Sequence, residues 1–304
     1  MTTSIAVMHF PSFSVVHITR AVRIIGLLAL CAVLSACSAI KLGYNNIGEV
    51  AYWWLDGYVD FSDEQAVRIR EDLARLHAWH RRQELPKLSA LLRNMEELAP
   101  GDITPAQVCA FVPALRSRIN AMTDRAEPAI VTTALDLAPE QLTHLERKFE
   151  RINNDYRKEW LRLNEAAVRD KRFDAFVDRS ETIYGSLDEP QRRVARAQIE
   201  QSIFDPKRFL EERRRRQQDL MQTLRKLTTP PQDFGQARSL VRGYLARVQE
   251  SPDATYRTYE QALIQEGCRT FSALHNSTTS AQRDAAVRRL RAYQRDLREL
   301  ASQQ

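Results

Sequence analysis

The sequence predicts an all-α fold, an elongated multi-helix bundle whose helices are joined by short capped connections. Three observations predict it. Glycine is scarce, with 9 residues in 304, and apolar residues recur at every third or fourth position over long stretches. The chain also lacks a run of alternating apolar and polar residues long enough for a half-buried strand.

The first 36 residues have the layout of a secretory signal peptide. They contain no acidic residue, carry Arg20 and Arg23 before the apolar run 24–34, and end in small residues. That run is too short to cross a hydrocarbon layer of about 30 Å as a helix. We therefore expect residues 1–36 to be removed, with initiation at Met1 or Met8 left open.

The four residues Leu34-Ser35-Ala36-Cys37 resemble the lipobox of bacterial lipoproteins. The resemblance implies a diacylglycerol on the Cys37 sulfur and cleavage just before it, which makes 37–43 a lipidated cysteine and tether. Two or more acyl chains hold a protein stably at a bilayer. In the lipoprotein sorting rules, Ser38 in place of Asp favours the periplasmic face of the outer membrane over the inner membrane. The alternative is a secreted protein with an unmodified Cys37.

Aromatic residues crowd the segment directly after the tether, namely Tyr52, Trp53, Trp54 and Tyr58. Folded as a helix, this segment is apolar on nearly every side, and Trp and Tyr favour membrane interfaces. Three interpretations stay open: bundle core, membrane-proximal contact, or a pocket for a ligand or partner.

Helix starts are predicted at five segments that offer a capping Ser, Thr or Asp, often with Pro or Glu. They are Phe61–Gln65, Asp102–Gln107, Asp136–Gln141, Ser186–Pro190 and Ser277–Gln282. Apolar stripes follow three of them, through Ala66, Ile69, Leu73, Leu76 and His80; Leu142, Leu145, Phe149, Ile152, Tyr156 and Leu163; and Ala286, Leu290, Tyr293, Leu297 and Leu300. Breakers fall at 98–102, 228–235 and 250–253. Residues 44–304 are therefore expected to form one all-α helical domain, with a subdivision near 228–235 left open.

Four consecutive arginines, Arg213, Arg214, Arg215 and Arg216, follow Glu211 and Glu212. Successive helical residues point about 100° apart, so the guanidinium groups spread around the helix. They either pair with the neighbouring glutamates on a solvated face or contact anionic headgroups of lipid.

Three residues at helical spacings, His77, His80 and Glu84, raise the question of a metal site. Neither a fourth ligand nor a recognised spacing is evident, so no metal or other cofactor is predicted. The simpler interpretation pairs Glu84 with Arg81 or Lys87, and Pro86 ends or kinks the helix.

Besides Cys37, two cysteines remain after the signal peptide, Cys109 and Cys268. In an oxidising compartment they could form one disulfide that closes a long loop, and buried free thiols are the alternative. Without Arg20 and Arg23, the 45 basic residues fall to 43 against 39 acidic ones, a net charge of +4. Such a mild excess argues little for nucleic acid as a partner.

Catalytic motifs are not recognisable in the sequence. We find no glycine-rich phosphate loop after a strand, no G-x-S-x-G elbow and no H-E-x-x-H pair, and so predict neither an enzyme nor a small-molecule substrate.

The lipobox, Tyr44-Asn45-Asn46, "WWLDGYVDFSDEQ" (53–65) and "WHRRQELPKLSALL" (79–92) together resemble an uncharacterised family of bacterial envelope lipoproteins, described only as a domain of unknown function. The resemblance extends to "LAPEQ" and "NNDYRKEWL" (153–161). It implies a helical envelope lipoprotein and brings no activity.

The starts at Thr104–Gln107 and Leu137–Gln141 are also similar to the LTxxQ motif of small helical periplasmic chaperones. Ala138 takes the place of the threonine in the second, and ordinary capping explains the same letters. The leading interpretation is a membrane-anchored interaction or scaffold protein with an envelope protein partner. The alternative is a periplasmic chaperone-like protein that binds unfolded or lipidic clients.

Overall fold

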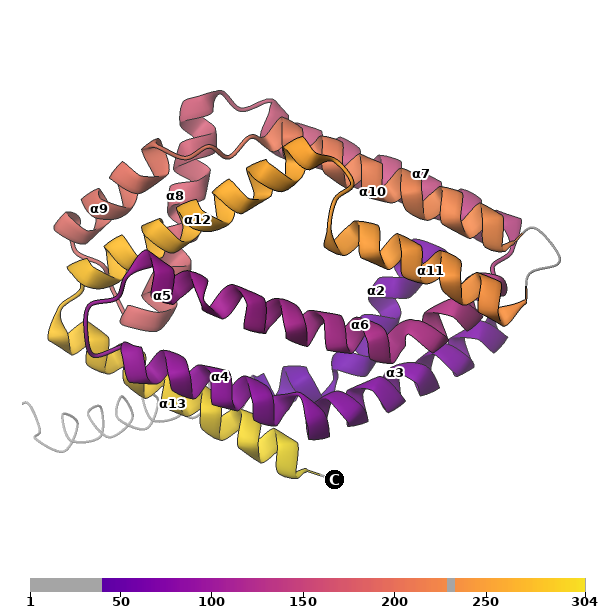
Figure 1. The fold of residues 1–304 in the computed structure, drawn as a ribbon, viewed down its shortest axis with the longest axis horizontal. Coiled ribbons are helices and arrows are strands. Elements are labelled where there is room, and N and C mark those ends of the chain that lie inside the picture. The colour runs from indigo at the N-terminus through magenta and orange to yellow at the C-terminus, as the bar shows by residue number, and fades with distance from the viewer. Residues whose placement is uncertain (1–39, 229–232, 304) are drawn as a thin grey trace, which may run out of the picture. The chain divides into compact units, whose positions relative to one another are not determined.

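A computed structural model describes residues 40–228 and 233–303 of the chain. The predicted signal peptide and Cys37 lie outside these ranges. Every regular element within them is a helix, which confirms the all-α multi-helix bundle (Figure 1). The chain divides into two compact units, Met1–Asn45 and Asn46–Gln304, and the second is described below.

The helices of the second unit are joined mostly by short connections. In chain order they are α2 (Ile47–Val59), α3 (Asp63–Gln83), α4 (Leu85–Leu98), α5 (Pro105–Cys109), α6 (Phe111–Leu135), α7 (Pro139–Tyr156), the π-helix η1 (Arg157–Leu161), α8 (Glu165–Tyr184), α9 (Glu189–Glu200), α10 (Pro206–Leu227), α11 (Phe234–Gln249), α12 (Ala254–Ser277) and α13 (Ser280–Ser302).

All five predicted helix starts are confirmed, because helices begin at Asp63, Pro105, Pro139, Glu189 and Ser280. Four of them have a full capping box, in which the cap side chain accepts from the third helical N–H and the glutamine there accepts from the cap N–H. The stripe predicted to run on to Leu163 is interrupted, since α7 ends at Tyr156 and the chain continues as a π-helical turn.

Four glutamines at these helix starts also bind one another across the fold. Gln65 of α3 and Gln141 of α7 exchange two side-chain hydrogen bonds of 3.2 and 2.7 Å, and both side chains are buried. Gln191 of α9 and Gln282 of α13 make the same exchange at 2.6 and 3.0 Å. Each pair therefore joins two helix N-termini that are far apart in the sequence.

Six helices pack in a closed circuit: α2 on α3, α3 on α6, α6 on α11, α11 on α10, α10 on α7 and α7 on α2. In Figure 1, α7 and α10 run side by side along the upper edge. The first core cluster lies in this group, with Val131, Leu142, Met221, Leu224 and Val241 among its buried residues.

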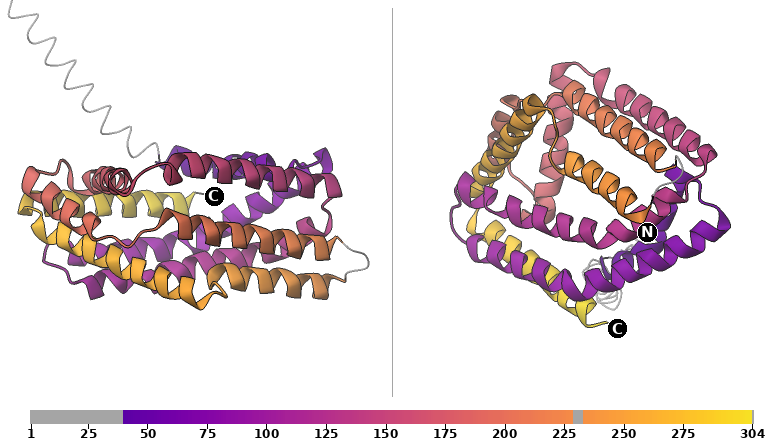
Figure 2. Two further views of the ribbon diagram at one scale, coloured as in Figure 1. Left: turned by 90° about the horizontal axis from the view of Figure 1, so that it is seen from above. Right: turned by 45° about the vertical axis from the view of Figure 1, so that its right-hand side comes forward.

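The remaining helices pack in a chain: α4 on α13, α13 on α8, α8 on α9, α9 on α12 and α12 on α5. The two views of Figure 2 also show α4 beside α13. Phe173, Val177, Tyr184, Ile199 and Leu274 belong to the second core cluster, which lies in this group.

A disulfide joins Cys109 at the end of α5 to Cys268 in α12, with the two Cα atoms 5.6 Å apart. These are the two cysteines for which the sequence suggests a bond. Asn276 reinforces the junction, because its side chain accepts from Ile103 N at 2.9 Å and donates to Ile103 O at 3.0 Å.

Candidate functional site

A predominantly apolar groove of about 770 Å³ lies in the group of helices that forms the closed circuit. We call it the apolar groove. Side chains from five helices of the closed circuit line it, namely α2, α3, α6, α7 and α10. Ligand-binding cavities commonly have such a size and such a predominantly apolar lining.

Two predicted apolar stripes supply parts of the groove wall. Leu73 and Leu76 come from α3, and Phe149 and Ile152 come from α7. All four side chains are only half-buried, whereas Leu142, two turns before Phe149 in α7, is part of the packed core and does not line the groove. The same stripe therefore begins in the core and ends at an open cavity.

Helix α6 leaves room for the cavity because it presents small side chains. Ala126, Ala129 and Ala134 line the groove together with Pro128 and the 38 %-exposed Ile130. Pro128 lies inside the helix without a backbone N–H to donate.

The aromatic segment of α2 contributes two rings to the groove. Trp54 and Tyr58 both line it, with ring centroids 4.8 Å apart, and Tyr58 also packs on Phe149 at 6.2 Å. Trp54 is 62 % exposed, so the cavity is open to solvent on that side.

The other two predicted aromatic contacts have different positions. Trp53 is 69 % exposed and does not line the groove. Tyr52 requires a correction, because its side chain is buried against Ala66 and Ile69 under the guanidinium group of Arg70. Tyr52 therefore stabilises the packing of α2 on α3 and is not a contact surface.

The arginine run also divides. Arg215 and Arg216 both pair with the buried Glu212, at 2.8 and 2.7 Å, so their predicted contact with anionic headgroups is corrected to an internal ion-pair role. Arg214 is exposed and lies on a separate hollow. Of these four arginines, only Arg213 lines the apolar groove.

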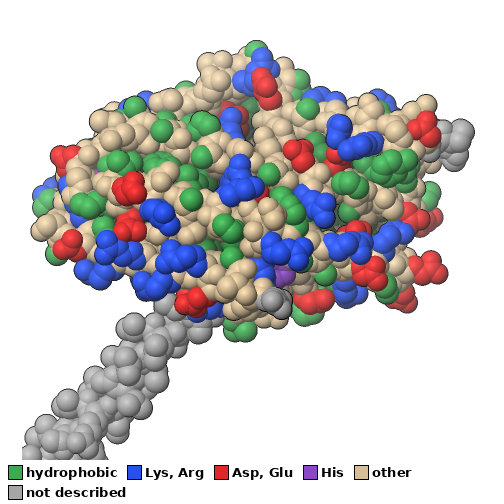
Figure 3. All heavy atoms as spheres, turned by 60° about the horizontal axis from the view of Figure 1, so that its bottom comes forward, with side chains coloured by type: hydrophobic (Ala, Val, Ile, Leu, Met, Phe, Trp, Pro, Cys, Tyr) green, Lys and Arg blue, Asp and Glu red, His purple; other side chains and the backbone are tan. Residues whose placement is uncertain are grey.

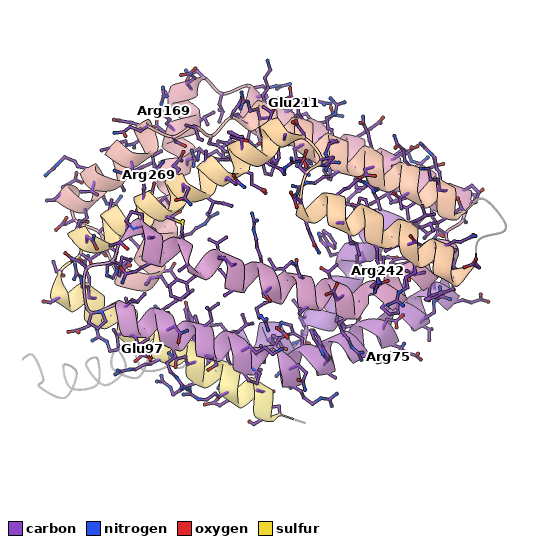
Figure 4. The ribbon with its side chains drawn as sticks, viewed as in Figure 1. Arg75, Glu97, Arg169, Glu211, Arg242 and Arg269 are labelled. Carbon is purple, nitrogen blue, oxygen red and sulfur yellow. A yellow bond between two sulfur atoms is a disulfide. The ribbon has the colours of Figure 1, made fainter. Side chains whose placement is uncertain are left out.

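Charges on the groove lining are few and unevenly balanced. Asp72 is bound by Arg75 at 2.7 Å, and Arg75 is labelled on α3 in Figure 4. Within the described ranges, neither Arg125 nor Arg213 has a carboxylate partner. The lining therefore carries an uncompensated positive charge.

The histidine cluster does not assemble a metal site in the part of the chain that the structure describes, where no three His, Cys, Asp or Glu side chains gather suitably. Glu84 is fully buried and binds Lys87 at 2.7 Å and Arg118 at 3.2 Å. Burial lowers the pKa of His77 and of His80, which favours their neutral forms.

Other buried polar groups have structural partners. Glu127 of α6 is 3 % exposed and binds Arg238 at 2.7 Å and Arg242 at 2.9 Å, and these bonds lower its pKa. Figure 4 labels Arg242 on α11. Tyr184 OH lies 2.8 Å from His275 Nδ1, whose Nε2 lies 2.8 Å from Gly101 O. This geometry fits a neutral imidazole, and burial lowers the pKa of His275.

A second hollow, of about 760 Å³, lies between α10 and α12. Its polar groups bind within the protein: Asp205 N donates to Tyr259 OH at 2.7 Å, and Arg208 lies 3.8 Å from the Asp205 carboxylate.

The surface away from the groove is mixed in charge. Figure 3 shows Lys and Arg side chains intermingled with acidic and hydrophobic ones over the face that includes α3, α4 and α13. None of the helices in the described chain is sufficiently long and apolar to cross a membrane.

The sequence interpretation missed the groove as a unit. It identified the stripe residues of α3 and α7, the rings of α2 and the arginine run separately, but not Ala126 or Ala129. The signal for the groove in the sequence was the concentration of alanines on one face of α6.

A model of a family described as "Family of unknown function (DUF6279)" matches residues 57–240. This segment includes α3, α6, α7 and α10, which build most of the groove. Neither a curated protein nor a solved structure matches the chain.

Proposed function

The chain belongs to the DUF6279 family of unknown function, and because membership brings no activity with it, we propose a function from the groove: a non-enzymatic, lipid-anchored binding protein of the cell envelope. In this proposal the apolar groove holds a lipidic client. The geometry thereby favours the chaperone-like alternative over the scaffold interpretation.

The observation that carries the proposal is the open apolar lining. Leu73, Leu76, Phe149 and Ile152 expose part of their surface within one concavity of about 770 Å³. Apolar surface in water is unfavourable, and large contiguous patches mark binding sites. An apolar occupant removes this surface from water without rearrangement of the core.

Hydrocarbon suits the groove better than unfolded polypeptide. A peptide backbone brings an N–H and a C=O at nearly every residue, and each needs a partner when buried. The uncharged polar side chains on the lining are few, chiefly Thr133, Gln217 and the Tyr58 hydroxyl. Acyl chains make no such demand.

The proposed location is the periplasmic face of the outer membrane, through acylated Cys37. Exposed side chains of α2 support contact with the bilayer, since Ile47, Val50, Trp53 and Trp54 are each more than 40 % exposed. Tryptophan and aliphatic side chains suit the interfacial region. Cys37→Ala should release the chain from membranes, and persistent attachment after signal removal would contradict the anchor.

Photo-crosslinking in living cells tests the groove. A photoreactive amino acid replaces Ile130 in the full chain, and Ala74 serves as the control because it is exposed on α3 beside the groove without lining it. We expect lipid adducts at position 130 and few at 74. Equal yields at the two positions would refute a groove-bound lipid, and diverse polypeptides at 130 would favour unfolded clients.

A scaffold role remains the second candidate, favoured by the exposure of Trp53. The same experiment at position 53 should capture membrane lipid if α2 lies against the bilayer. One dominant protein at fixed ratio would instead support an assembly component.

A further inference from the structure

We infer that the client of the apolar groove is a phosphate-headed lipid, with its acyl chain against the apolar lining and its phosphate at Arg213 and Gln217 of α10. This inference rests on the proposed function and specifies the chemistry of the bound molecule. Four observations support it: two lining residues whose donor groups have no acceptor in the described chain, the buried unpaired hydroxyl of Tyr156 beside Arg213, the charge of the lining, and its size.

Arg213 and Gln217 are four residues apart and therefore share one face of α10. Both line the groove. Gln217 Oε1 accepts a 2.7 Å hydrogen bond from Asn153 Nδ2, which directs the amide nitrogen of Gln217 away from Asn153. In the described chain this nitrogen has no acceptor, and the guanidinium group of Arg213 has none either.

Two polar atoms of α7 near these residues are buried without a partner in the described chain, Asn153 Oδ1 and Tyr156 OH. Asn153 is 6 % exposed. Arg213 lies over the Tyr156 ring, 5.7 Å from its centroid. Burial raises the pKa of Tyr156 to about 12, so its hydroxyl keeps its proton and can donate. Unpaired buried polar groups are costly. The Tyr156 hydroxyl can donate to a phosphate oxygen, whereas Asn153 Oδ1 is an acceptor and needs a donor such as water.

The charge of the lining favours a phosphate over a carboxylate or a neutral headgroup. Arg125 and Arg213 lack carboxylate partners, while the lining carboxylate Asp72 is already bound by Arg75. A phosphate monoester carries a charge of about −1.5 to −2 and three acceptor oxygens, and guanidinium groups bind it with charge-assisted hydrogen bonds.

Two of the nearby carboxylates oppose such an anion only weakly, because they are paired. Glu159 and Asp205 act electrostatically on Tyr156. Lys171 binds Glu159 at 2.6 Å, and Arg208 lies 3.8 Å from Asp205.

The volume suits one long acyl chain with its headgroup. If a methylene group occupies about the same space as a water molecule in the liquid, roughly 30 Å³, then the groove of about 770 Å³ has room for roughly 25 such groups. A monoacylglycerol phosphate with a long chain is of this size.

Three photoreactive probes with the same diazirine-bearing acyl chain test the inference: a monoacylglycerol phosphate, the matched monoacylglycerol, and the matched fatty acid. Each is added to full-length acylated protein in phosphatidylcholine vesicles, and adducts are mapped to peptides. The variants are Arg213→Gln, Arg213→Lys and, as a matched control, the exposed neighbour Arg214→Gln, which lies outside the groove. Circular dichroism checks that each variant is folded.

We expect the phosphate probe to label groove peptides most strongly. Arg213→Gln should reduce that labelling about 10-fold or more, the effect of one lost charge-assisted hydrogen bond. Arg213→Lys should retain part of it, and Arg214→Gln should match the wild type. The yield from the neutral probe should be unchanged by Arg213→Gln.

Groove labelling that is equal for all three probes, or stronger for the fatty acid, would overturn the phosphate assignment and leave the lipid-binding function intact. Equal losses in Arg213→Gln and Arg214→Gln would also overturn it. If no probe labels the groove, the proposed function itself fails.

Discussion

Removing the Cys109–Cys268 disulfide should destabilise the protein by several kcal/mol through the unfolded state. The two cysteines are 159 positions apart. For a closed loop of this length, the loss of chain entropy in the unfolded state corresponds to about 5 kcal/mol, and native disulfides typically contribute about 2 to 5. The bonds between Asn276 and Ile103 still hold α5 near α12 in the folded state. We therefore expect the double variant Cys109→Ser/Cys268→Ser to fold with unchanged helicity.

Urea unfolding followed by circular dichroism and by tryptophan fluorescence measures the effect. With a slope of about 3 kcal/mol/M, the midpoint should fall by about 1 to 2 M. With a reducing agent, the wild type should have the same urea midpoint as the variant. The reducing agent should not change the midpoint of the variant. A shift smaller than about 0.3 M, with coincident curves from the two probes, would refute the argument from loop entropy.

Three further predictions concern buried polar contacts. In a double-mutant cycle, Gln65→Ala and Gln141→Ala should each lower the free energy of unfolding by about 1 to 3 kcal/mol. The double variant should lose clearly less than the sum, because either single change already leaves the other glutamine unpaired. Additive losses in urea unfolding would contradict the mutual hydrogen bonds. Glu127→Gln should lower the free energy of unfolding by about 1 to 2 kcal/mol. The loss is this small because water screens the half-exposed arginine partners. The control Glu97→Gln, at an exposed position, should change the free energy of unfolding by less than about 0.5 kcal/mol. Burial lowers the pKa of His275 below its ordinary value of 6.5, so the unfolded state binds the proton more readily and stability should fall as pH drops below about 6.5. His275→Gln should flatten that dependence between pH 7.5 and 5.5, and an unchanged slope would show that other groups cause it.

Helix starts were the most predictable part of this fold, since their chemistry is local. Ser62 with Gln65 and Thr279 with Gln282 satisfy N–H groups within four residues, and no distant contact is needed to form the box. The hydrogen bonds between glutamines of different helix starts could not be predicted in the same way. It depends on which helix ends meet, and that is set by packing across more than seventy residues.

The groove was not predictable because an apolar stripe has the same spacing whether it faces a packed core or an open cavity. Leu142 and Phe149 are two turns apart in one stripe, yet the first is buried in the core and the second lines the groove. Likewise, the sequence does not distinguish the four consecutive arginines, because their roles depend on their neighbours in the fold. Glu212 binds Arg215 and Arg216, whereas Arg213 lines the groove.

The paired glutamines have a consequence for how the length of this chain can change. Each of them fixes the first turn of its own helix and also the position of a second helix end, so a residue inserted or deleted beside Gln65, Gln141, Gln191 or Gln282 would disturb two helices at once. The far ends of α3 and α13 are joined by a 3.1 Å hydrogen bond from Arg81 to Gln303, but the far ends of α7 and α9 have no glutamine pair of this kind in the described chain. We expect family members of different length to vary there and in the connection between α10 and α11, and to keep the spacing around these four glutamines.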